Sequence, residues 1–175
     1  MAEPVNFTLL EGEQIAVVGA NGAGKSMFVD MIAGRHPIYP DSVRYDFTPS
    51  TKEYIADNIN YITFRDTYGG DNDRTYFLLR KLKLASALFA EPRVMIIDNP
   101  FIGLDADTRL QLRDLLATLI QPSTDKNTPT PQLILVLSKT DDIPDFITHI
   151  VEVKDMKVMP KTTRVHYIYN IEPQP

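Results

Sequence analysis

Short apolar runs alternate with amphipathic segments along this chain. The runs at 14–18, 94–97 and 133–137 are almost continuously apolar, which is typical of strands buried on both faces of a parallel sheet. Weaker patterns predict further strands at 5–9, 42–47, 60–64, 150–153 and 164–170, with 158–159 completing a hairpin. Because strands and helices alternate, we expect an α/β fold with a mostly parallel sheet and helices on both faces.

Amphipathic helices are expected between these strands. The first covers 27–33, the second ends before Pro92, and the third begins at Asp105 or Asp107 and reaches residue 120. Helical spacing marks the side chains expected to face the core, which are Leu78, Leu82, Ala85 and Phe89 on the second helix and Leu112, Leu115, Leu116 and Leu119 on the third.

Residues 19–26, Gly-Ala-Asn-Gly-Ala-Gly-Lys-Ser, match the GxxxxGK[ST] phosphate-binding motif and lie between a predicted strand and a predicted helix. Gly19, Gly22 and Gly24 allow the backbone to direct successive N–H groups at phosphate oxygens beside a helix N-terminus. Lys25 adds a positive charge, and the hydroxyl of Ser26 suits a magnesium ion shared with the nucleotide. The alternative is a glycine-rich turn with a surface lysine. The flanking elements favour a nucleoside triphosphate, bound by Gly19, Asn21, Gly22, Ala23, Gly24, Lys25, Ser26 and Met27.

Asp98 ends the apolar run at 94–97. A carboxylate there lies at the edge where open α/β sheets bind ligands, so we expect Asp98 to face the phosphate loop. Together with Ser26 it would hold magnesium, directly or through water. The alternative is that Asp98 caps the turn that follows.

These motifs resemble those of the ATP-binding cassette (ABC) ATPases. The phosphate loop of that family is typically GxNGxGKS, which residues 19–26 match, and its second motif is an apolar strand followed by Asp-Glu-Pro and a Gly-Leu-Asp turn. Asp98, Pro100 and residues 103–105 fit the second motif with the family's spacing. The resemblance extends over residues 3–159, and the segments that look like the ModF-type molybdenum-transport ATP-binding proteins are 63–69, 99–105 and 133–146.

The resemblance implies a P-loop nucleoside triphosphate hydrolase fold with ATP and magnesium as cofactors. In this family ATP joins two such domains face to face, so the expected partner is a second ABC domain, in a homodimer or as a fused tandem copy. Family members couple this closure to a membrane permease or to soluble partners, which implies a cytoplasmic protein or one peripheral at the inner membrane. Transport of molybdate is implied by the resemblance alone.

Several positions depart from the family pattern. Asn99 stands where most members have a glutamate that polarises the attacking water. An amide can orient water but cannot accept its proton, and losing a general base typically reduces the rate by about 10²–10⁴. Ser138 aligns with the switch histidine that contacts the terminal phosphate, and Phe64 or Arg65 replaces the usual glutamine. With Asn99 and Ser138 at the catalytic positions, we expect slow ATP hydrolysis.

The helical subdomain of the family, with its LSGGQ-like signature, is missing from its expected place. Only a dozen residues separate Arg65 from Leu78, and Thr75–Phe77 contains no glycine. We therefore expect residues 1–175 to form a single, incomplete ABC-type domain, with either a truncation or a junction between separated segments near residues 77 and 78.

Two other classes of function stay open at this point. A GTPase would share the phosphate loop, and Ser138–Asp141 resembles the guanine-reading NKxD element, although the DxxG expected at the magnesium aspartate is absent at Asp98. The other class is a nucleotide-gated module that binds ATP and dimerises without useful hydrolysis, which Asn99 and Ser138 favour. An ATPase domain with slow turnover is the preferred interpretation.

Composition narrows these choices. The net charge of −5 offers no general basis for binding nucleic acid. The chain has no cysteine, and its three histidines are far apart in the sequence, so we expect no thiolate or histidine metal site. No apolar run approaches the about 18 residues that span a bilayer, and no secretory signal is visible at the N-terminus.

Overall fold

The computed structural model describes residues 5–36, 42–64, 73–121 and 130–171, except for the side chains of 73–77. Seven strands in these segments form one sheet in the order β2-β3-β4-β1-β5-β6, with β7 paired to β5. β1 to β5 pair in parallel, whereas β6 and β7 run antiparallel to β5. The strands are β1 (Ile15–Val18), β2 (Ile59–Thr63), β3 (Val94–Asp98), β4 (Gln132–Leu137), β5 (His149–Lys154), β6 (Lys157–Val158) and β7 (Thr162–Thr163). The expected mostly parallel α/β sheet is confirmed.

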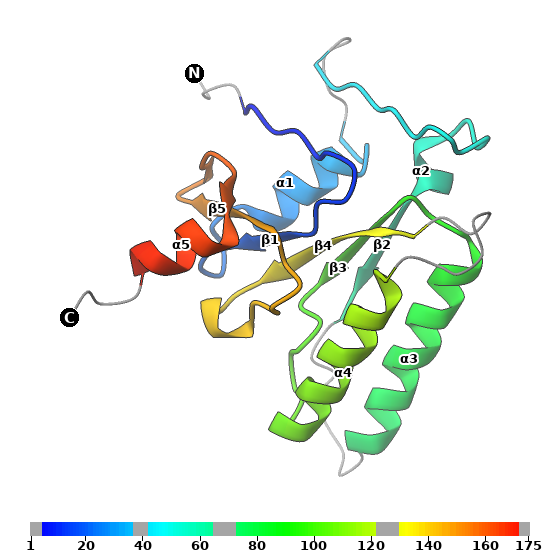
Figure 1. Ribbon diagram of the computed structural model, residues 1–175, viewed down its shortest axis with the longest axis vertical. Coiled ribbons are helices and arrows are strands. Elements are labelled where there is room, and N and C mark those ends of the chain that lie inside the picture. The colour runs from blue at the N-terminus through cyan, green and yellow to red at the C-terminus, as the bar shows by residue number, and fades with distance from the viewer. Residues whose placement is uncertain (1–4, 37–41, 65–72, 122–129, 172–175) are drawn as a thin grey trace.

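Helices cover both faces of this sheet (Figure 1). Phe28 of α1 packs on the face that carries Ile15 and Val17, whereas Leu84 of α3 and Leu112 of α4 pack on the opposite face. Because successive side chains of a strand point to opposite faces, a strand covered on both sides is apolar throughout. The helices are α1 (Lys25–Ile32), α2 (Ile55–Asn58), α3 (Asp73–Phe89), α4 (Ala106–Leu119) and α5 (Arg164–Ile171), with a 3₁₀ turn at Thr140–Asp142.

The register of the parallel strands brings three turns to one edge of the sheet. Val18, the last residue of β1, pairs with Leu137 at the end of β4. Asp98, the last residue of β3, pairs with Val136 of β4 on one side and with Thr63 of β2 on the other. The turns after β1, β3 and β4 are therefore neighbours.

The third predicted helix is confirmed as α4. Asp105 is its N-cap, because its carboxylate accepts a hydrogen bond from the Thr108 amide at 2.7 Å. Leu112 and Leu116 are fully buried, as expected for the core side of this helix. The remaining two expected core positions, Leu115 and Leu119, are partly buried.

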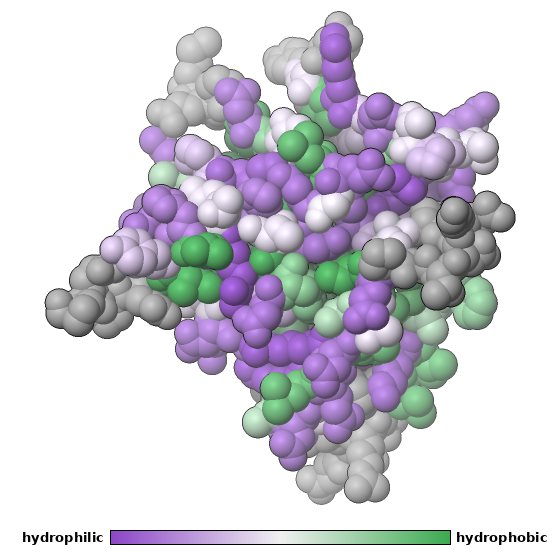
Figure 2. Space-filling view, viewed as in Figure 1, coloured by the Kyte–Doolittle hydropathy of each residue, from purple (hydrophilic) through white to green (hydrophobic). Residues whose placement is uncertain are grey.

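The buried face of α3 differs from the expected one. Leu78, Leu82 and Phe89 are 57%, 57% and 88% exposed, and Figure 2 shows apolar side chains on the outer side of this helix. The residues that pack on the sheet are instead Leu84 and Ala87. Both stripes have helical spacing, and the difference is a rotation of the helix about its axis, which periodicity alone does not determine.

Two predicted strands on the α1 side of the sheet are irregular segments. Residues 5–9 and 42–47 form no strand, although their aromatic side chains pack against α1. Phe7 meets the ring of Phe28 edge to face at 5.2 Å, and Tyr45 donates a hydrogen bond to the Ile32 carbonyl at 3.1 Å. Their apolar pattern thus serves packing on a helix rather than strand pairing.

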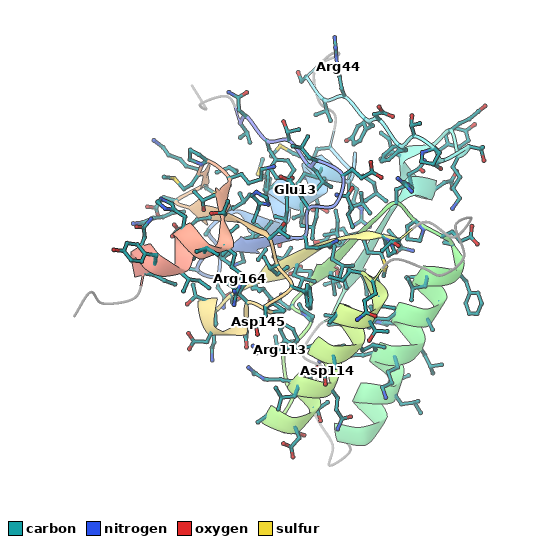
Figure 3. The ribbon with its side chains drawn as sticks, in the orientation of Figure 1. Glu13, Arg44, Arg113, Asp114, Asp145 and Arg164 are labelled. Carbon is teal, nitrogen blue, oxygen red and sulfur yellow. The ribbon has the colours of Figure 1, made fainter. Side chains whose placement is uncertain are left out.

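The predicted edge strand at 164–170 is wrong, because this segment is helix α5. Arg164 at its start pairs with Asp145 at 2.5 Å, and Figure 3 shows the two side chains together. Tyr167 packs against the core, while Val165 and Tyr169 are 77% and 63% exposed. A helix that lies on the surface of a protein packs one face on the core and exposes the other, as α5 does here.

The backbone is continuous at residues 77 and 78, since α3 runs without interruption from Asp73 to Phe89. Residues 65–72, which also belong to the region of the expected junction, lie outside the described residues. The assignment of 1–175 to one incomplete domain stays a prediction. Among the described helices, none combines the length and the apolar character that a bilayer crossing requires.

Candidate nucleotide-binding site

The loop between β1 and α1 rests on the hairpin formed by β5 and β6. A Cβ on Gly19 would lie 2.2 Å from the Val153 carbonyl oxygen, and one on Gly24 would lie 2.9 Å from the Met156 sulfur. The Met156 amide also donates a hydrogen bond to the Ala23 carbonyl at 3.0 Å. Gly19 is therefore required for close packing against a backbone carbonyl, whereas Gly24 faces a flexible methionine and is favoured mainly by its φ of 104°.

Lys25 begins α1 and points back into the loop. Its Nζ donates hydrogen bonds to the carbonyls of Gly19 at 2.6 Å and Ala20 at 2.9 Å, and the residue is only 7% exposed. Burial lowers the pKa of Lys25, while the negative charge of Asp98 opposes that shift. Because carbonyl oxygens carry only partial charge, the ammonium group keeps a positive charge that can attract a phosphate.

The predicted site residues meet at one cavity of about 240 Å³. Three segments far apart in the sequence contribute to it: the phosphate loop, the end of β3 and the end of β4. Its lining residues are Asn21, Gly22, Gly24, Lys25, Ser26, Met27, Asp98, Asn99 and Ser138. Gly19 and Ala23, also expected to bind the nucleotide, do not line this cavity. Their carbonyls accept hydrogen bonds from Lys25 and Met156.

Asp98 lies at the end of β3 and is only 7% exposed. The hydroxyl of Tyr61 donates a hydrogen bond to its Oδ2 at 3.4 Å. Burial raises the pKa of Asp98, whereas this hydrogen bond and the charge of Lys25 lower it. Burial and the charge of Asp98 also raise the pKa of Tyr61 to about 12, so the phenol is a donor at neutral pH.

The oxygen donors of the cavity fit magnesium. Ser26 and Asp98 line the same cavity and offer a hydroxyl and a carboxylate. The described residues hold no group of three or more His, Cys, Asp or Glu side chains that would form a protein-only cage. Magnesium typically takes one or two carboxylates together with water and substrate phosphates. Ser26 and Asp98 therefore remain the predicted metal ligands.

Asn99 and Ser138 lie beside each other at the edge of the cavity. The Ser138 hydroxyl is 3.0 Å from Oδ1 of Asn21 and 3.4 Å from Oδ1 of Asn99. One hydroxyl proton serves one acceptor at a time, so the shorter contact to Asn21 is the stronger one. All three side chains are neutral, and no proton acceptor of carboxylate or imidazole type occupies either predicted catalytic position.

Comparisons with known proteins agree with this arrangement. Residues 2–68 match the family model for ABC transporters. An uncharacterized ABC transporter ATP-binding protein of Schizosaccharomyces pombe, C323.04, is 36% identical over 89 residues, covering 51% of this chain and 17% of the relative. The ATP-binding protein ModF of Escherichia coli is 28% identical and covers 81% and 36% of the two chains. The aliphatic sulfonates import protein SsuB of Corynebacterium glutamicum is 25% identical and covers 86% and 73%.

Solved structures of ABC proteins share the fold. CbiO1 from Clostridium perfringens superposes with a TM-score of 0.67 at 18% identity, covering 96% of this chain and 84% of the other. The ATP-binding cassette MJ0796, described in a dimeric post-hydrolysis state, gives a TM-score of 0.60 at 17% identity, covering 93% and 90%. The structures show that the fold is shared, and the relatives to which this chain is similar are ATP-binding proteins of ABC type. The chain spans about a third or less of the length of C323.04 and ModF.

Within this ABC-type fold, sequence reasoning missed three residues that shape the site. Arg80 of α3 is buried and donates to the carbonyls of Pro100 and Ile102, so it holds the loop that follows Asp98. Met156 supports the phosphate loop, and Tyr61 contacts Asp98. Because α3 contains two arginines and two lysines, its sequence alone does not show which basic side chain is buried.

The segment that resembles a guanine-reading element is used differently here. Ser138 lines the cavity, but Asp141 does not. The Asp141 carbonyl accepts a hydrogen bond from Arg113 of α4 at 2.9 Å, and Asp142 pairs with Arg109 at 2.8 Å. The backbone of Asp141 and the side chain of Asp142 thus attach the 3₁₀ turn to α4. Arg65, one of the two residues aligned with the family's glutamine, lies outside the described residues.

Proposed function

We propose that this chain binds ATP with magnesium at the edge of the sheet, as an ABC-type nucleotide-binding domain, and hydrolyses it slowly. The observation that carries the proposal is the convergence of Lys25, Ser26 and Asp98 on one cavity beside the N-terminus of α1. Backbone N–H groups of the loop and Lys25 would bind phosphate oxygens. Ser26 and Asp98 would hold the cation, which when bound neutralises charge on the terminal phosphates.

We expect slow turnover because Asn99 and Ser138, the two predicted catalytic residues, have neutral side chains. Asn99 can orient a water molecule through its amide, but the proton of that water has no acceptor there. Ser138 is hydrogen-bonded to Asn21 and carries no charge. We expect a rate about 10²–10⁴ below that of a site with a general base.

A second candidate is a nucleotide-gated dimerisation module without useful hydrolysis. The neutral side chains of Asn99 and Ser138 at the two predicted catalytic positions favour it, because neither can accept a proton from the attacking water. Single-turnover hydrolysis with excess protein separates the two candidates. Release of phosphate at a slow but measurable rate supports the ATPase, whereas stable bound ATP supports the module.

The partners we propose are a second ABC domain, in a homodimer or as a fused copy, and a membrane permease beside which the domain lies in the cytoplasm. CbiO1 is described as part of the ABC transporter complex CbiONQ, and MJ0796 as dimeric. ModF and SsuB have similar identities to this chain, so these relatives do not favour molybdate over sulfonates as the transported substrate. A permease gene beside this one would support the transport role.

Nucleotide binding itself is tested by titrating the chain with a fluorescent ATP analogue in the presence of magnesium. Competition with unlabelled ATP and GTP then separates the ABC-type site from a GTPase. We expect ATP to compete at least as well as GTP, because the DxxG element typical of GTPases is absent at Asp98. Strong preference for GTP, or no binding at all, contradicts the proposal.

A further inference from the structure

Tyr61 lies where strand pairing brings it close to Asp98. Thr63 of β2 pairs directly with Asp98 of β3, and Tyr61 is two residues earlier on the same face. The tyrosine side chain therefore extends along the strand toward the carboxyl edge, where its hydroxyl donates to Oδ2 of Asp98 at 3.4 Å. Tyr61 does not line the 240 Å³ cavity, so it reaches the site through Asp98.

The ring of Tyr61 is held from the side of α1. The guanidinium of Arg35 lies 4.2 Å from the ring centre, a cation–π contact. Arg35 in turn pairs with Asp30 of α1 at 3.5 Å. Asp30 is four residues after Ser26, so both lie on one face of α1.

These side chains surround a second cavity next to the first. Its volume is about 490 Å³, and Ser26, Asp30, Arg35, Tyr61, Asp98 and Asn99 are among its lining residues. Ser26, Asp98 and Asn99 also line the 240 Å³ cavity, so the two spaces adjoin. The Tyr61 hydroxyl thus contacts Asp98 from the side of the 490 Å³ cavity, which Tyr61 lines, whereas Tyr61 does not line the 240 Å³ cavity.

We propose that Tyr61 is a positioning residue for the divalent cation. Its hydroxyl orients the Asp98 carboxylate through Oδ2 and would leave Oδ1 available to a cation held together with Ser26. Hydrogen bonds to metal-ligating carboxylates set their orientation, and removing such a partner typically costs about 10–100-fold in metal affinity. This inference rests on the proposed binding of magnesium and ATP.

The test uses Tyr61→Phe, which removes the hydroxyl and keeps the ring beneath Arg35. Tyr45→Phe is the matched control, because it also removes a hydrogen-bonded phenol near α1 but does not contact Asp98. Manganese affinity of the ATP-bound full chain is measured by electron paramagnetic resonance. Affinity for a fluorescent ATP analogue is measured separately with EDTA present.

We expect Tyr61→Phe to weaken manganese binding about 10-fold, with affinity for metal-free nucleotide and thermal stability close to the wild type. Tyr45→Phe should leave both affinities unchanged. Manganese affinity equal to that of the wild type overturns the inference, and so does an equal loss of metal and metal-free nucleotide binding, which indicates a structural role. If the wild type binds no nucleotide in either condition, the proposed function itself fails and this inference fails with it.

Discussion

Lys25 carries its charge inside the phosphate loop, where two backbone carbonyls hold its ammonium group. No other lysine or arginine lines the 240 Å³ cavity among the described residues. The loop therefore offers partial positive charge from N–H groups and one full charge from Lys25.

Lys25→Ala should lower ATP affinity about 100-fold, because hydrogen bonds between charged groups contribute about 1.5–3 kcal/mol each. Lys139→Ala is the control, since Lys139 is exposed and lies next to Ser138 without lining the cavity. Calorimetric titration measures the affinities, and circular dichroism verifies the fold. Wild-type affinity in a folded Lys25→Ala protein would contradict nucleotide binding at this loop.

Asn99 has a left-handed backbone, with φ of 52°. Asparagine adopts this conformation more readily than longer side chains do, so substitution by glutamate adds strain of about 1–2 kcal/mol. Asn99→Glu should nevertheless raise single-turnover hydrolysis, because it supplies a proton acceptor. The gain should be modest while Ser138 stays in place.

Asn99→Gln is the control that distinguishes the effect of a proton acceptor from the effect of backbone strain. Glutamine matches glutamate in length but accepts no proton. Phosphate release is measured for the two variants with nucleotide bound to both. A faster Asn99→Glu protein supports a base at this position. Equal rates in the two variants would mean that residue 99 does not face the attacking water.

The phosphate loop and the β5–β6 hairpin form one packed unit. Gly19 approaches the Val153 carbonyl so closely that even a methyl group has no room, whereas a Cβ on Gly22 would meet no atom within 4 Å. The two glycines therefore have different structural roles, although both are glycine positions of the GxNGxGKS motif. Gly19 permits packing, and Gly22 permits a left-handed turn with φ of 80°.

Gly19→Ala should lower the free energy of unfolding by about 3 kcal/mol, because the backbone of β5 must move to admit the methyl group. Gly22→Ala should cost only about 1 kcal/mol, for the strain of its positive φ. Urea denaturation of the nucleotide-free proteins measures both. Similar losses in the two variants would show that the hairpin does not constrain the loop.

The buried strands could be predicted from the sequence because their own residues determine them. The way in which helices pack on the sheet could not. The strands ending at Val18, Asp98 and Leu137 were expected because residues buried on both faces must be apolar throughout. The face of α3 that packs, and the helical form of 164–171, depend on neighbours that no local pattern reveals. The same holds for Tyr61, whose contact with Asp98 exists only after β2 and β3 pair.

At the scale of the whole molecule, Glu13 connects the segment before β1 with the segment after β6. Its side chain, labelled in Figure 3, accepts hydrogen bonds from the Leu10 amide at 2.9 Å and from Lys161 at 2.6 Å. Burial pushes the pKa of Glu13 upward, but these two partners and the nearby His149 lower it below its ordinary value overall. A depressed carboxyl pKa contributes stability above its unfolded value, and that stability is lost as the pH falls through the folded pKa.

Glu13→Gln should therefore destabilise the protein by about 1–3 kcal/mol at pH 7, where Lys161 loses its charged partner and keeps the Thr8 carbonyl, and by much less near pH 3. Thermal or urea unfolding of the wild type and the variant at both pH values measures the difference. An equal loss at pH 7 and pH 3 would show that the charge of Glu13 does not contribute.

The position of β1 between β4 and β5 has a consequence for synthesis. Both strands that pair with β1, and the hairpin that supports the phosphate loop, come from the last third of the chain. When the glycine-rich segment leaves the ribosome, β4 and β5 have not yet been synthesised. The phosphate loop then lacks the β5–β6 hairpin against which it packs in the folded protein. We therefore expect the phosphate loop to reach its folded conformation only after translation has passed Met156, whose amide binds the Ala23 carbonyl.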